Sequence, residues 1–241
     1  MSGMIVLLCS IYLFLSSSSG ATIGAKLISG PDVSPCVSGV LEVPHGTGPF
    51  PGVILLHGAA GWDSRYPNLA KVLADSGFAT LALDYYAEAG PSAIRSEEKL
   101  QKWPLYQATV RNAVEYMHKL PYVADQPVAL VGFSRGAFLA ISVASSVSSV
   151  KAVVDFFGGG GGGTKSLEQE VQGLPPLLIL HGDADRIVPV KFAHDLRDAV
   201  VTAGGEVEMH IYPGEGHGLS EATMRDGLQR TVDFLRLRLR N

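Results

Sequence analysis

The sequence has little charge of either sign. Only 17% of its 241 residues are charged, and the formal net charge is −4. No basic run is present that would neutralise phosphates, so there is no electrostatic basis for nucleic-acid binding and none is expected. A hydrophobic content of 46% excludes a disordered chain and indicates a large buried core.

Cysteine is almost absent. The chain contains two, Cys9 and Cys36, and Cys9 lies in an N-terminal apolar stretch. If that stretch is removed, Cys36 is left alone and can form neither an intramolecular disulfide nor a cysteine-based metal site. Neither a metal nor a cofactor is expected.

The apolar stretch at residues 4–15, "MIVLLCSIYLFL", is shorter than the roughly 20 residues that a membrane-spanning helix needs. Its length and the small residues that follow are typical of a secretory signal peptide. We predict a signal peptide at residues 1–20, an extension at 21–36, and a secreted or periplasmic protein without stable membrane association. The segment "MSG" lacks Lys and Arg, so an uncleaved anchor, a mis-assigned start and a buried segment are alternatives.

From residue 37 to 241 the sequence alternates between strand-like and helix-like segments. Apolar runs predict strands at 52–58, 78–86, 127–133, 151–157, 176–182 and 206–212. Between them the spacing predicts helices at 66–77, 92–120, 135–147, 190–203 and 220–240, with Gly77 ending the first and Trp103-Pro104 breaking or kinking the second. This alternation predicts one α/β domain: a mostly parallel sheet with helices on both faces and no separate lid domain.

A run of six glycines, residues 158–163, precedes Thr164, Lys165 and Ser166. A phosphate-binding loop needs glycine directly before Lys-Ser or Lys-Thr, and Thr164 intervenes here. We therefore expect no nucleotide site, but a flexible surface loop followed by a short helix capped by Ser166.

The segment "VALVGFSRGAFLAI", residues 128–141, places Ser134 between a strand and a helix within the pattern G-x-S-x-G. In a nucleophile elbow the serine takes a strained backbone conformation that exposes its hydroxyl. Gly132 and Gly136 lack side chains that would make strand and helix collide. Ser134 is the candidate nucleophile.

A serine hydroxyl needs a histidine to accept its proton, and the histidine needs a carboxylate to orient it. In α/β-hydrolases these follow in the order serine, acid, histidine. Asp183 and Asp185 follow the strand of "LLILHGDADRIVPV", and His217 follows the last strand in "YPGEGHGL". Parallel strands bring all of them to one edge of the sheet. A metal site at His181, Asp183 and Asp185 is a weaker alternative.

After residue 37 the chain resembles the dienelactone hydrolase family of α/β-hydrolases. The resemblance rests on "VILLHGAAGW", "GFATLALDYY", "LVGFSRGA", "LLILHGDADRIVPV" and "YPGEGHGL". It implies an α/β-hydrolase fold, Asp185 as the acid and His217 as the base. The namesake enzymes carry cysteine at the elbow and an acid after the first buried strand. Here Ser134 and "HGAAG" stand at those places, which favours a serine esterase.

Backbone N–H groups must bind the oxyanion that forms during acyl transfer. We predict Ala59 and Arg135 as the donors, with Ala60 as an alternative to Ala59. His57 and His181 are predicted to support loops by hydrogen bonding. The other histidines are predicted at the surface or at helix ends: His45, His118, His194 and His210.

Aromatic side chains near the strand ends are candidates for the substrate pocket, with core packing as the alternative: Trp62, Tyr85, Tyr86 and Trp103. The predicted function is hydrolysis of small or short-chain carboxylic esters, including lactones, through an acyl-enzyme. The expected partner is a small-molecule ester. A serine peptidase acting on short peptides and a non-catalytic ligand-binding protein are the alternatives.

Overall fold

The computed structural model describes residues 14–15, 22–24, 35–89, 101–162 and 165–239. Their strands form one sheet in the order β1-β2-β3-β5-β4-β6-β7-β8-β9. The six neighbouring strands β5-β4-β6-β7-β8-β9 are parallel, whereas β3 runs antiparallel to β5. The core strands are β3 (Gly39–Glu42), β4 (Gly52–Leu56), β5 (Ala79–Leu83), β6 (Val128–Phe133), β7 (Val150–Phe156), β8 (Leu177–Gly182) and β9 (Val207–Tyr212).

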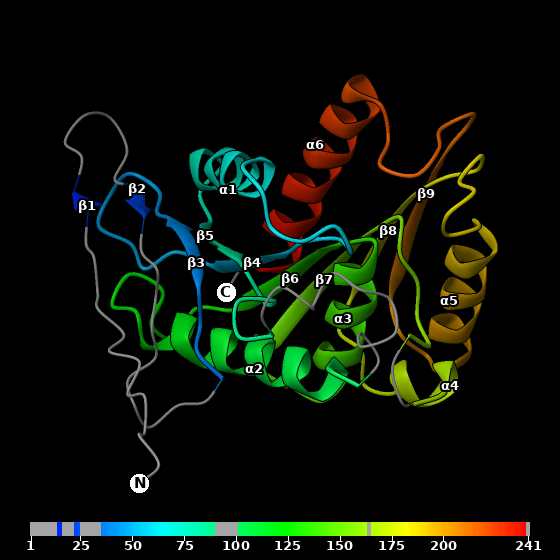
Figure 1. The fold of residues 1–241 in the computed structure, drawn as a ribbon, viewed down its shortest axis with the longest axis horizontal. Helices are drawn as coiled ribbons and strands as arrows, with labels where there is room; N and C mark the ends of the chain where they lie inside the picture. Colours follow the sequence, from blue (N-terminus) through cyan, green and yellow to red (C-terminus); the bar gives the residue numbers. More distant parts are fainter. Residues whose placement is uncertain (1–13, 16–21, 25–34, 90–100, 163–164, 240–241) are drawn as a thin grey trace, which may run out of the picture.

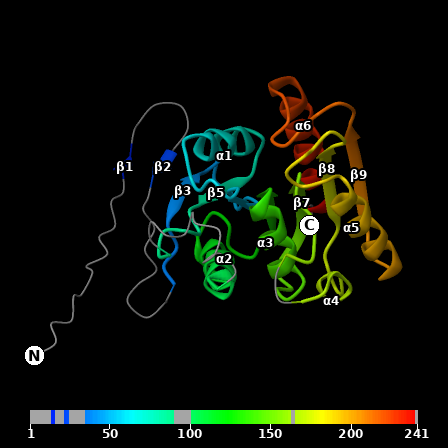
Figure 2. The same ribbon diagram turned by 45° about the vertical axis from the view of Figure 1, so that its right-hand side comes forward.

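Helices cover both faces of the sheet (Figures 1 and 2). On one face lie α1 (Arg65–Asp75) and α6 (Glu221–Arg238), and on the other α2 (Trp103–Lys119), α3 (Arg135–Ala144), α4 (Leu167–Glu170) and α5 (Lys191–Thr202). Alternate strand residues enter two separate cores. Val53 and Leu55 pack toward α1 and α6, whereas Ile54 and Leu56 pack toward α2 and α3. This two-faced burial explains why the central strands are continuous apolar runs.

The parallel register aligns the carboxyl ends of the central strands. Leu56 of β4 lies opposite both Leu83 of β5 and Gly132 of β6. The turns that follow these strands therefore meet at one edge of the sheet, as the sequence predicted.

Two helix boundaries illustrate what the pattern predicted well and badly. Gly77 follows the end of α1 with φ of +103°, so its predicted role at the helix end is confirmed. The predicted helix at 92–120 instead begins at Trp103, with Pro104 in its first turn; residues 90–100 lie outside the described residues. Proline begins this helix rather than breaking it, because a first-turn N–H has no intrahelical acceptor.

The prediction that the glycine run is a surface loop is wrong for its first half. Residues 158–160 are buried at the carboxyl end of β7. A Cβ on Gly158 would lie 2.4 Å from the Cβ of Ala137 on α3, and one on Gly162 would lie 2.7 Å from Phe138 Cδ1. The glycines therefore allow close packing against α3. The predicted short helix is confirmed as α4, and Ser166 caps it.

Two short strands extend the sheet beyond β3. They are β1 (Phe14–Leu15) and β2 (Thr22–Gly24), and both pairings are antiparallel. They fall within the predicted signal peptide and extension, which otherwise lie largely outside the described residues. In the part of the chain that the structure describes, no helix combines the length and hydrophobicity needed to cross a bilayer.

Candidate active site

Ser134 lies in a strained turn between β6 and α3. Its φ of +53° and ψ of −118° are rarely adopted by residues with a side chain. A Cβ on Gly132 would lie 2.4 Å from Ala137 Cα, and one on Gly136 would lie 2.3 Å from Leu56 O. Gly132 is therefore required because α3 approaches it closely, and Gly136 is required because β4 does.

A chain of hydrogen bonds connects Ser134 to His217 and Asp185. The distance from Ser134 Oγ to His217 Nε2 is 3.0 Å, and from His217 Nδ1 to Asp185 Oδ2 it is 2.7 Å. With Nδ1–H donating to the carboxylate, Nε2 is left to accept the serine proton. The turns after β6, β8 and β9 position the three side chains, in the order predicted from the sequence.

Asp185 is buried but well supplied with hydrogen-bond donors. Besides His217, the backbone amides of Ile187 and Val188 donate to its Oδ1 at 2.8 and 2.9 Å. Burial by itself would raise the pKa of Asp185. The hydrogen bonds from His217, Val188 and Ile187 outweigh it and hold the pKa below its ordinary value. The carboxylate therefore stays charged beside His217.

Asp183, the other candidate acid, has a different position. It is exposed, and its Oδ1 accepts a hydrogen bond from Gly214 N at 2.7 Å. Asp183 joins the turn after β8 to the turn after β9, which carries His217. The described residues contain no group of three or more potential metal ligands, so the cluster considered for His181, Asp183 and Asp185 does not form.

His57 and His181 support loops, as predicted. His57 is fully buried, stacks on Tyr85 at 3.9 Å between ring centroids, and donates from Nδ1 to Gly58 O at 2.9 Å. His181 donates from Nε2 to Val188 O at 2.8 Å, and burial lowers its pKa. Of the remaining histidines, His45 is exposed; the half-buried ones are His118 at the end of α2, His194 in α5 and His210 in β9.

Both predicted oxyanion donors lie beside Ser134. Arg135 is the first residue of α3, so its N–H has no acceptor within the helix. Ala59 is in the turn after β4 and lines the same cavity as Ser134, as does Ala60. The N–H of the preceding residue, Gly58, is engaged by Tyr66 Oη at 2.9 Å.

A cavity of about 730 Å³ opens beside Ser134 and His217. Its wall is mostly apolar and comes from α1, the turns after β4, β7, β8 and β9, and the start of α6. Besides the residues named above, the lining residues are Arg65, Asn68, Leu69, Phe133, Phe157, Gly218, Leu219, Ser220, Glu221 and Met224.

The predicted pocket residues Trp62, Tyr85 and Tyr86 do not line this cavity. Tyr85 is 1% exposed, and its hydroxyl donates to His57 O at 2.8 Å. Tyr86 is also buried, and Arg135 Nη1 donates to its hydroxyl at 3.3 Å. The rings of Tyr85, Tyr86 and Trp103 pack in the core instead, because the turn after β5 folds back onto β4 and α2. Trp62 is 36% exposed and lies outside both the cavity and the core.

Sequence reasoning missed the apolar side chains that line the cavity. Phe157 contacts the His217 ring edge-to-face at 5.0 Å between centroids. Leu69, Leu219 and Met224 are half-buried on α1 and near the start of α6. The one available signal was position: Phe157 ends a predicted strand and Leu219 follows the candidate histidine by two residues.

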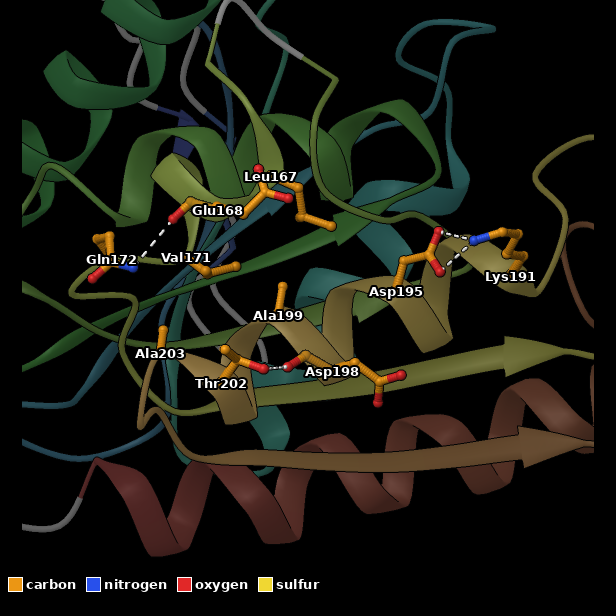
Figure 3. A pocket seen from close by; sticks show the side chains of 10 residues that line it. All are labelled: Leu167, Glu168, Val171, Gln172, Lys191, Asp195, Asp198, Ala199, Thr202 and Ala203. Atoms are coloured by element: carbon orange, nitrogen blue, oxygen red, sulfur yellow. Dashed lines mark hydrogen bonds and ion pairs between the residues drawn. The ribbon is translucent and has the colours of Figure 1, made fainter.

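A second hollow of about 500 Å³ lies between α4 and α5 (Figure 3). Lys191 and Asp195 form an exposed ion pair at its rim, and Thr202 donates to the backbone oxygen of Asp198. Its lining includes no histidine or cysteine. The Ser134 cavity is therefore the candidate active site.

Comparison with solved structures identifies the fold. A putative dienelactone hydrolase from Klebsiella pneumoniae superposes with a TM-score of 0.76 at 20% identity, covering 87% of this chain and 96% of that one. Esterase PE8 superposes with a TM-score of 0.66 at 22% identity, covering 84% and 99%. The prediction of an α/β-hydrolase fold is confirmed.

Sequence comparison gives relatives and a family. Acyl-coenzyme A thioesterase 5 of Mus musculus is 35% identical over 142 residues, which are 58% of this chain and 31% of the relative. The peroxisomal succinyl-coenzyme A thioesterase of Mus musculus is 30% identical over 174 residues, 72% and 35% of the two chains. This chain thus spans about a third of these curated relatives. The pattern of the Dienelactone hydrolase family matches residues 37–234. The chain belongs to the dienelactone hydrolase family.

Proposed function

We propose that this protein hydrolyses carboxylic esters or thioesters through an acyl-enzyme on Ser134. The observation that carries the proposal is the continuous hydrogen-bond chain from Ser134 through His217 to the charged Asp185, at the wall of an apolar cavity. The relatives named as thioesterases and the structural neighbour named as an esterase support ester or thioester bonds.

The proposed mechanism assigns one role to each group at the site. Ser134 Oγ attacks the substrate carbonyl carbon while its proton passes to His217 Nε2. The negative Asp185 stabilises the imidazolium, and the N–H groups of Ala59 and Arg135 bind the oxyanion. As the tetrahedral intermediate collapses, the bond to the leaving group breaks and His217 gives the proton to that oxygen or sulfur. A water molecule then repeats the sequence on the acyl-enzyme, releasing the acid and restoring Ser134.

Labelling and substrate comparison test the proposal. The wild type and Ser134→Ala are treated with a fluorophosphonate probe and assayed with p-nitrophenyl acetate, an acyl-coenzyme A thioester and a peptide anilide. We expect labelling and ester or thioester turnover in the wild type only. Equal labelling of both variants contradicts the assignment of Ser134, and faster turnover of the anilide favours the peptidase alternative.

A matched pair of variants tests the acid. Asp185→Asn keeps acceptors for Ile187 and Val188 but favours the wrong imidazole tautomer, so kcat on p-nitrophenyl acetate should fall by about 10⁴-fold. Asp183→Asn retains its acceptor for Gly214 and should keep nearly full activity. The reverse ranking would assign the acid to Asp183.

A further inference from the structure

Backbone strain is concentrated around the cavity. Among the described residues, four non-glycine residues have positive φ, and three of these line it: Ser134 at +53°, Phe157 at +45° and Leu219 at +55°. Such conformations persist only where the surroundings enforce them, and they gather at functional sites. The strain at Ser134 belongs to the nucleophile elbow, whereas that at Leu219 has no role in the proton transfers.

Hydrogen bonds close the turn that carries Leu219. Gly218 precedes it with φ of +99°, and Ser220 follows it. The backbone N–H and the hydroxyl of Ser220 donate to the carboxylate of Glu215 at 2.8 and 2.6 Å, and Thr223 donates to the same carboxylate. The turn from 215 to 223 is thereby closed on itself. It directs the Leu219 side chain to the cavity wall beside His217.

The cavity next to Leu219 is mostly apolar. Leu69 from α1 and Met224 from α6 join Leu219 in packing against the same core cluster as Phe133 and Phe157. The two charged side chains at the lining belong to exposed ion pairs at its rim: Arg65 Nη2 lies 2.6 Å from Asp63 Oδ2, and Glu221 Oε1 lies 2.5 Å from Arg225 Nη1. This wall thus favours hydrocarbon over a carboxylate or phosphate.

We infer that Leu219, Leu69 and Met224 form the binding site for an apolar arm of the substrate, and that Leu219 determines the length accepted. The inference rests on the proposed ester or thioester hydrolysis. Either the acyl chain or the alcohol of the ester has this chemistry. Leu219 and His217 line the same cavity, so the bulk of Leu219 restricts how much of the arm the cavity can hold.

The test changes side-chain volume at one position. Leu219→Ala enlarges the cavity and Leu219→Phe reduces it, and kcat/KM is measured for p-nitrophenyl esters from acetate through octanoate to palmitate. A second series holds the acid as acetate and lengthens the alcohol. The series that varies the part of the substrate bound in the cavity should respond. In that series, Leu219→Ala should raise the ratio of long-chain to short-chain kcat/KM by roughly tenfold, and Leu219→Phe should lower it.

Two controls separate volume from other effects. Leu219→Gly removes the side chain and also relieves the strained φ. If side-chain volume sets the preference, Leu219→Gly should shift it in the same direction as Leu219→Ala. Leu237→Ala shortens an exposed leucine of α6 outside the cavity lining and should leave the preference unchanged. Thermal unfolding and fluorophosphonate labelling establish that each variant is folded with a reactive Ser134.

The outcomes distinguish the two proposals. A wild type that hydrolyses no ester or thioester overturns the proposed function and this inference with it. An active wild type whose ratios stay unchanged in all Leu219 variants, in both series, overturns the inference alone. A shift in Leu219→Gly that is absent from Leu219→Ala also overturns it, because the backbone rather than the side chain would then set the preference.

Discussion

Asp155 and Asp185 are buried carboxyl groups near the ends of neighbouring strands, with opposite electrostatic environments. Asp185 accepts hydrogen bonds from one side chain and two amides, and its pKa is lowered. Asp155, in β7, accepts one bond from Gly158 N at 2.7 Å, while its Oδ2 has no hydrogen-bond partner. Burial raises the pKa of Asp155 to about 7 despite that bond. The number of donors decides which carboxyl is charged.

The raised pKa of Asp155 predicts a pH-dependent effect of Asp155→Asn. The ordinary pKa is near 3.8, so between these two values the unfolded state loses a proton that the folded state keeps. The free energy of unfolding of the wild type therefore falls as pH rises from about 3.8 to about 7. Above pH 7 the accumulated loss reaches roughly 4 kcal/mol. Asparagine removes this loss. In urea unfolding, Asp155→Asn should gain stability over wild type at about pH 8 but little at about pH 4.

Asp155→Ala is the companion variant. It leaves Gly158 N without its acceptor and should be less stable than Asp155→Asn at both pH values. Its stability relative to wild type should nevertheless change with pH in the same direction. A stability difference between Asp155→Asn and wild type that is constant with pH would contradict the assignment.

At the scale of elements, the contact between β6, α3 and β4 fixes the nucleophile turn. A methyl group on Gly136 would lie 2.3 Å from Leu56 O and 2.6 Å from His57 O, both backbone atoms. Gly136→Ala must push α3 away from β4, so we expect a loss of about 3 kcal/mol in the free energy of unfolding. Ester hydrolysis should fall too, since Ser134 moves with the helix.

Gly216→Ala is the matched control for that substitution. A Cβ on Gly216 meets no atom within 4 Å, so its midpoint in urea should stay close to that of the wild type. Equal stability of Gly136→Ala and wild type would show that the elbow relaxes freely, contrary to the packing described above.

The sequence predicted elements better than their environments. In a domain where strands and helices alternate, the continuous apolar runs at β4, β6 and β8 indicate strands buried on both faces. The glycine run illustrates the limit: its composition suggested a mobile surface loop, whereas Gly158 is buried against Ala137. Glycine serves equally for flexibility and for close approach, and only the neighbouring helix distinguishes these roles.

At the scale of the whole molecule, β1 and β2 extend the sheet past β3, while the family match begins at residue 37. We propose that residues 1–20 nevertheless direct export. When the full chain is expressed in a secretory host, the mass of the exported protein should be lower than that of the full chain by the mass of residues 1–20. Leu8→Arg, which interrupts the apolar stretch, should prevent export, whereas a full-length intracellular product from the unaltered chain contradicts the proposal.

The sequence by itself determined the α/β order, the strained serine turn and the types of residue that follow the last strands. These depend on local periodicity and on spacing along the chain. Only the tertiary structure decided which groups meet. It placed Tyr85 in the core and brought Leu69 next to Leu219 and Met224, residues separated by about 150 positions. Side-chain surroundings come from the packing of distant elements, and neither periodicity nor a short motif encodes that contact.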